Sequence, residues 1–148
     1  MRTSIGARER PIDPDAVALV HRSFDAVEAN ARQATALFCR RLANVAPDVR
    51  VVLPDDLEAR ASDVIATVAP IVRHLGDPDE LTRLAGDLAR RVPAVALRPH
   101  HLEIVGEAIV WTLSTGLGHL FTPAHRDAWR AAYASLSTAL LHAAHQSA

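Results

Sequence analysis

The stretch RPHHLEIVGEAIVWTL, residues 98–113, carries the pattern that decides the fold. Pro99 is suited to the first turn of a helix, where the missing N–H of proline costs nothing. Apolar side chains then recur at spacings of three and four, at Leu102, Val105, Ile109 and Leu113. This spacing places them on one face of an α-helix. We therefore predict a helix that begins at Pro99 and buries this stripe.

The same helical periodicity extends along the rest of the chain, and strand-like alternation is nearly absent. We predict an all-α domain of about six main helices, which run from 14, over about 34–44, over about 55–75, from 78, from 99 to about 113, and from 123. Pro70 lies inside the third of these, where we expect a kink or a break. Residues 47–54 are expected to form a connector, and residues 114–120 a glycine-containing turn.

The domain organisation predicted from the sequence is simple. We expect residues 1–13 to be a disordered N-terminal extension and residues 14–148 to form one domain. A chain of 148 residues with 49% apolar residues can bury a sufficient core without cross-links. Its single cysteine, Cys39, excludes an intramolecular disulfide, which fits a reducing compartment.

The charge and hydropathy of the chain exclude two classes of partner. The formal net charge of −1 lacks the basic excess of a nucleic-acid-binding protein. The most apolar stretch, around residues 104–113, is interrupted by Glu107 and falls short of the ~20 apolar residues that a membrane-spanning helix needs. The N-terminus also lacks the apolar segment of a secretory signal. We expect a cytoplasmic protein that binds neither nucleic acid nor membrane.

Several strings carry a family resemblance. They are LVHRSF at 19–24, ATALFCRRLANVAPDVRVVLP at 34–54, the stretch at 98–113, and DAWRAAYASL at 127–136. In this order and spacing they resemble the bacterial single-domain globins and the globin domain of flavohaemoglobins, over roughly residues 17–141. The resemblance implies a globin fold, with haem and oxygen binding between the third and fourth predicted helices.

At the positions that contact haem, the sequence departs from this family. The position that resembles the proximal histidine, which ligates the iron, is Val92. The position of the distal tyrosine is Cys39, and Leu53 replaces a phenylalanine that packs on the haem. The distal polar position corresponds best to Arg60, with Glu58 or Ala59 as alternatives because of the loop lengths. The fold strings are therefore kept while the usual iron ligand is missing.

These changes predict a haem-free or atypical sensor or ligand-binding module rather than an enzyme. An emptied pocket would be lined by Leu53, Val64, Leu88, Val92, Leu97, Leu102 and Val105. Such a lining favours an apolar small ligand, for example an acyl chain, whose carboxylate Arg60 could meet. No phosphate-binding loop, nucleophile motif or poised carboxylate pair is found in the sequence.

An alternative hypothesis keeps the cofactor. Haem would then be ligated in a non-standard way by His101 or Cys39, and would bind oxygen or nitric oxide by family analogy. His101 is the favoured metal ligand of the two adjacent histidines, although an exposed polar residue in the first turn of its helix is the more common case. For Cys39, a small buried hydrophobic residue is likewise the more common case. A homodimer formed through the last two helices, with Trp111 and Leu117, is a further prediction.

Overall fold

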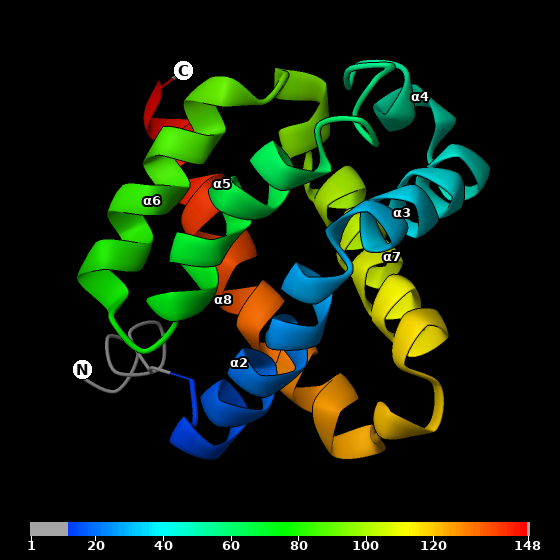
Figure 1. Ribbon diagram of the computed structural model, residues 1–148. Coiled ribbons are helices and arrows are strands. Elements are labelled where there is room, and N and C mark those ends of the chain that lie inside the picture. The colour runs from blue at the N-terminus through cyan, green and yellow to red at the C-terminus, as the bar shows by residue number, and fades with distance from the viewer. Residues whose placement is uncertain (1–11, 148) are drawn as a thin grey trace.

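The computed structural model describes residues 12–147, and the helices and turns of these residues contain no strand. Seven α-helices follow one another: α2 (Pro14–Ala29), α3 (Ala31–Val45), α4 (Pro47–Arg50), α5 (Ala61–Arg73), α6 (Pro78–Arg91), α7 (Pro99–Leu117) and α8 (Pro123–Ser147). Two 3-10 turns, η1 (Ala94–Leu97) and η2 (Gly118–Leu120), flank α7. The all-α prediction is confirmed, because the six expected helices are present together with the short α4 (Figure 1).

Proline and capping side chains determine where several helices begin. Asp13 Oδ1 accepts a hydrogen bond from the backbone N–H of Asp15 at 3.4 Å, and Pro14 occupies the first position of α2. Asp77 Oδ1 accepts from the N–H of Glu80 at 3.2 Å at the start of α6. Each carboxylate satisfies a donor that has no partner within the helix. The helix starts predicted at these two sites are confirmed.

The region between α3 and α5 differs from the prediction. Pro47 begins the short helix α4 where a connector was expected, with Asp48 in its first turn. Proline at the first position and an acidic residue next to it both favour a helix start. In turn, α5 begins at Ala61 rather than near residue 55, because residues 54–60 form turns in which the N–H of Arg60 bonds to the carbonyl of Asp56 at 3.1 Å.

Two further boundaries differ from expectation. Helix α5 ends at Arg73 rather than near residue 75, and it continues through Pro70. The expected break at Pro70 is therefore absent, and the kink stays a prediction. Residues 114–117, expected in a turn, continue α7. Gly118 then ends this helix with a φ of 59°, a left-handed conformation that glycine adopts without a steric penalty.

Helix α8 is the axis around which the domain packs. It contacts α2, α6 and α7, while α3 packs across α7 and also contacts α5. Figure 1 shows α5 and α6 on one side of α8 and α3 with α7 on the other. This arrangement brings the apolar stripes of all the long helices toward the same interior.

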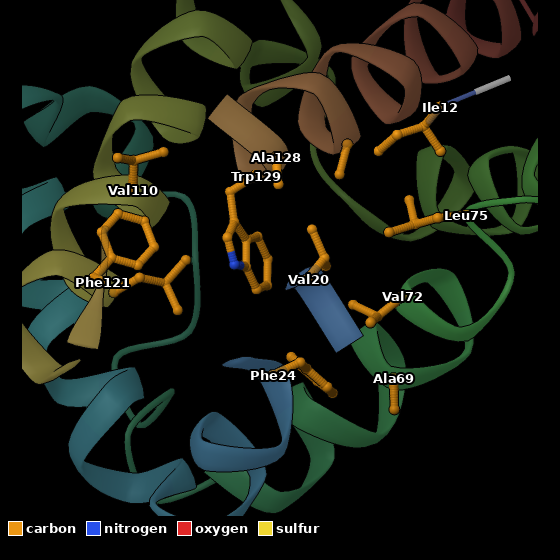
Figure 2. Close-up of a cluster of buried hydrophobic side chains, with 12 residues drawn as sticks. Ile12, Val20, Phe24, Ala69, Val72, Leu75, Val110, Phe121, Ala128 and Trp129 are labelled. Carbon is orange, nitrogen blue, oxygen red and sulfur yellow. The ribbon is translucent and has the colours of Figure 1, made fainter. Parts of the chain in front are cut away.

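The largest cluster of buried apolar side chains surrounds Trp129 of α8. Figure 2 shows its ring in the middle of the cluster, with Val20 of α2 on one side and Val110 and Phe121 on the other. The indole N–H donates to Ser23 Oγ at 2.8 Å, so the buried nitrogen keeps a partner. A buried tryptophan with a satisfied N–H contributes both area and orientation to a core.

The N-terminal extension predicted over residues 1–13 falls mostly outside the described residues, which exclude 1–11. Of the two that are described, Ile12 is buried in the cluster around Trp129 and Asp13 caps α2. Residues 12 and 13 therefore belong to the packed domain. Within residues 12–147, no helix has the length and apolar character required to cross a membrane.

Candidate functional site

A cavity of about 230 Å³, partly open to solvent, lies between the helices. Its wall is drawn from α2, α3, α4, α5, α6, α7 and α8, and also from η1. The lining is almost entirely apolar, and among the described residues no charged side chain contributes to it. A concave apolar pocket of this kind is the usual site for a small ligand.

Six of the ten residues predicted from the sequence to form the site lie on this wall. They are Leu53, Leu88, Val92, Leu97, Leu102 and Val105. They come from separate parts of the chain: the turn after α4, the end of α6, η1 and α7. The other four predicted residues, which are Cys39, Arg60, Val64 and His101, are not part of the wall.

Two residues of α8 contribute the polar atoms of the lining. Trp129 and Tyr133, which are not among the site residues predicted from the sequence, both line the cavity. The hydroxyl of Tyr133 donates to the carbonyl oxygen of Leu102 at 2.6 Å. Burial raises the pKa of Tyr133, so the phenol stays protonated. The signal in the sequence was the shared helical stripe of these residues with Leu136 and Leu140, which also line the cavity.

The position of Tyr133 depends on a glycine in the facing helix. A Cβ atom on Gly106 of α7 would lie 2.5 Å from Cε2 of Tyr133, which is closer than carbon atoms approach. The absent side chain lets the Tyr133 ring lie directly on the backbone of α7. This glycine is part of the IVGE string on which the family resemblance rests, and its contact with Tyr133 gives it a packing role.

His101 is buried rather than exposed, with only 6% of its surface accessible. Its Nδ1 lies 2.7 Å from the carbonyl oxygen of Val95, and its Nε2 lies 2.9 Å from Asp48 Oδ2. Each ring nitrogen therefore lies within hydrogen-bond distance of an oxygen atom. Neither ring nitrogen is free for a metal, and the ring is outside the cavity wall.

The contact with His101 also affects Asp48. Partial desolvation raises the pKa of Asp48, but hydrogen bonds from its own backbone N–H, from His101 and from the N–H of Val49 lower it more. The net result is a pKa below the ordinary value of 3.8. The carboxylate form is the one that accepts from the imidazole, so the pair is stabilised when Asp48 is ionised.

Arg60, Val64 and Cys39 lie away from the cavity in different ways. The Arg60 side chain is 56% exposed and pairs with Asp56, with Nε 3.0 Å from Oδ2. Val64 is half-buried on α5. Cys39 is buried, and desolvation raises the pKa of its thiol above 9.0, a shift that Arg50 opposes and Glu58 reinforces. A thiol that stays protonated at neutral pH is a poor iron ligand.

The residues present do not fit an iron-ligated haem in this arrangement. Within the described part of the chain, no histidine or cysteine lies on the cavity wall, and no group of three or more metal-binding side chains gathers anywhere. Val92, which the sequence resemblance predicts at the position of the proximal histidine, has only an apolar side chain to offer on the cavity wall. The cavity is also small for a porphyrin. An apolar cavity of roughly 150 Å³ fits one benzene, and this cavity of about 230 Å³ is only about half as large again, whereas a porphyrin is several times larger than benzene.

Comparisons with known proteins agree with the fold. Residues 30–140 match the family model described as Globin. Over 133 residues, which are 88% of this chain, the sequence is 25% identical to a flavohemoprotein of Deinococcus radiodurans. It is 26% identical to a flavohemoprotein of Pseudomonas putida over 130 residues, or 85% of the chain. A neuroglobin of Tetraodon nigroviridis is 32% identical over 76 residues, which are 51% of this chain and 47% of the neuroglobin.

The coverage of these relatives is unequal. The aligned region makes up 33% of each of the two flavohemoproteins, so this chain corresponds to about a third of their length. The family model, in contrast, covers most of the chain from the start of α3 into α8. The helices, their order and the sequence match lead to the same conclusion: this chain belongs to the globin family.

Proposed function

We propose that this chain is a haem-free ligand-binding module of the globin family, which holds an apolar small molecule where other members hold an iron-ligated haem. The observation that carries the proposal is the side chain of Val92. It lies on an apolar cavity wall, and the family resemblance of the sequence assigns Val92 to the position of the iron ligand. A sensor role follows naturally, since occupancy of such a cavity changes the stability of the helices around it.

The energetics of the cavity support a ligand. Side chains that line an empty space lose dispersion contacts on one side. A bound apolar molecule restores those contacts, and its transfer from water contributes about 25 cal/mol for each Å² of apolar surface buried. Because the ligand binds only the folded state, it also stabilises the protein as its concentration rises above Kd.

Binding rather than catalysis is the activity that the cavity supports. Among the lining residues of the described chain, Tyr133 is the one ionisable group, and burial raises its pKa. General acid–base chemistry needs a group whose pKa is close to the working pH. Nucleophilic catalysis needs a base within reach of the nucleophile, and none of the other described lining residues is a base that could activate the Tyr133 hydroxyl.

A hemin titration tests the proposal directly. The purified protein is titrated with hemin while its visible spectrum is recorded. We expect broad, non-saturating absorbance without a sharp Soret band. A sharp band that saturates at one hemin per chain would overturn the proposal and favour the alternative, in which haem is ligated in a non-standard way. His101→Ala and Cys39→Ala would then identify the ligand, because only the variant that lacks it loses the band.

A homodimer is a separate part of the proposal. Trp111 is half-buried beneath the guanidinium of Arg41, which lies 5.3 Å from the ring centroid. Leu117 packs against the core cluster from the end of α7. A pairing surface on the last two helices would include this region. Light scattering at several protein concentrations tests it, and a monomeric mass at the highest concentration would overturn it.

A further inference from the structure

We infer that the ligand of this cavity is an uncharged molecule with a compact hydrocarbon body of roughly nine carbon atoms and at most one hydroxyl group. This inference rests on the proposed function and makes it more specific. It also replaces the acyl carboxylate that the sequence suggested, because Arg60 does not reach the cavity.

The ligand is inferred to be uncharged because the described cavity wall has no charged side chain that could pair with it. In the described chain, no arginine, aspartate or glutamate lines the cavity. Arg60 pairs with Asp56, and Arg50 donates to the carbonyl oxygens of Pro54 and Asp55 at 3.2 and 3.5 Å. A carboxylate or an ammonium group moved into this space would lose its hydration without gaining an ion pair. Such burial is strongly unfavourable, so the site selects neutral molecules.

The hydroxyl of Tyr133 limits the polar group that the ligand can carry. Its proton is already donated to the carbonyl oxygen of Leu102 at 2.6 Å, which leaves only acceptor capacity on the oxygen. The N–H of Trp129 is likewise donated to Ser23. Of these two side chains, only Tyr133 keeps a hydrogen-bonding capacity, as an acceptor at its hydroxyl oxygen. A ligand hydroxyl, which donates, fits this arrangement better than a ketone or an ester, which only accept.

The volume of the cavity sets the size of the ligand. A dry apolar cavity of roughly 150 Å³ holds one benzene. The cavity here, at about 230 Å³, is about half as large again. In proportion it holds roughly nine carbon atoms. A phenyl ring with a three-carbon chain matches this volume.

Four probes that share this nine-carbon frame separate charge from shape. They are propylbenzene, 3-phenylpropan-1-ol, 3-phenylpropanoate and 3-phenylpropylammonium. The binding of each probe is measured at pH 7.5 by calorimetry. The NMR resonance of the Trp129 indole N–H shows whether the probe binds at the cavity. The variant Trp111→Phe removes the other indole N–H and so assigns this resonance. We expect the alcohol and propylbenzene to bind once per chain and to shift this resonance. The carboxylate and the ammonium compound should bind at least tenfold more weakly.

The variant Tyr133→Phe tests the hydroxyl contact. We expect this variant to bind the alcohol severalfold more weakly and propylbenzene with nearly unchanged affinity. Binding of propylbenzene also shows that the variant is folded. Equal losses for both probes, or no loss for the alcohol, would overturn the hydroxyl contact.

The remaining outcomes separate this inference from the proposed function. If 3-phenylpropanoate bound as tightly as the alcohol and shifted the Trp129 resonance, the ligand would not need to be neutral, and the inference would fail while the ligand-binding function stood. If all four probes left the Trp129 resonance unchanged at millimolar concentration, or if hemin bound stoichiometrically, the proposed function itself would fail.

Discussion

The Nε2 atom of His101 lies 2.9 Å from Oδ2 of Asp48, a residue far away in the sequence. The other ring nitrogen lies 2.7 Å from the carbonyl oxygen of Val95. A single side chain of α7 thus joins α4 to η1, and both elements contribute residues to the cavity wall. The histidine that the sequence suggested as a metal ligand has, in the fold, a bridging role beside the cavity.

Replacing His101 tests this bridge. His101→Leu should lower the free energy of unfolding by about 1–3 kcal/mol, because the part-buried carbonyl of Val95 loses its side-chain partner and Asp48 loses its contact. His100→Leu is the matched control, since His100 is the exposed neighbour on the same turn. It should change the free energy by no more than about 0.5 kcal/mol. Urea denaturation measures both, and equal effects would contradict the bridge.

The ionisation of Asp48 should be visible in the pH dependence of the free energy of unfolding. Its pKa is lower in the folded protein than its ordinary value of 3.8, so its ionised form stabilises the fold above that pH. This contribution is lost as the pH falls through the lowered folded-state pKa. Asp48→Asn should therefore be less stable than the parent at pH 6, and the difference should shrink by pH 3.

The control for this comparison is Asp25→Asn, which changes an exposed carboxylate on α2. Its difference from the parent protein should stay small at both pH values. Denaturation curves of the three proteins at pH 6 and pH 3 provide the measurement. A gap between Asp48→Asn and the parent that stays constant, or widens toward pH 3, would show that the carboxylate form of Asp48 does not stabilise the fold.

Replacing Gly106 by alanine should change the stability in the direction opposite to that usual for a helix interior. Glycine to alanine in a helix interior normally stabilises by up to about 1 kcal/mol. Gly106→Ala should instead destabilise by about 1–3 kcal/mol, because the new Cβ would lie 2.5 Å from the Tyr133 ring. Gly116→Ala on the same helix meets its nearest neighbour, Leu37, at 3.9 Å. Thermal denaturation should show opposite shifts for the two variants, and a stabilising Gly106→Ala would contradict the contact.

Filling the cavity should abolish ligand binding. Ala132 of α8 lies on the cavity wall, and its neighbour Ala131 is exposed. Ala132→Leu adds three carbon atoms to a space that holds roughly nine, and should reduce the affinity for propylbenzene at least tenfold. Ala131→Leu adds the same atoms outside the cavity and should leave the affinity unchanged. Calorimetry compares them, and equal affinities would place the ligand elsewhere.

Much of the fold could be predicted from the sequence because helix signals are local. The caps at Asp13 and Asp77 and the stripe from Leu102 to Leu113 depend on residues within a few positions of each other. The start of α5 could not be predicted in the same way. The apolar spacing after residue 55 is compatible with a helix, but the chain forms turns over residues 54–60 before α5 begins.

Part of the candidate site could likewise be predicted from the sequence, and part of it could not. The residue order alone was enough to predict that an apolar pocket would include Val92, Leu53 and Leu102, because helix faces and the family resemblance follow from it. The roles of His101, Arg60 and Tyr133 became clear from the folded structure. Each role depends on a partner: Asp48 and Val95 occupy the histidine, Asp56 pairs with the arginine, and Gly106 admits the tyrosine ring. Two of these three arrangements join segments that are distant in the chain, and a hydrogen bond or a close contact exists only once packing brings its two halves together.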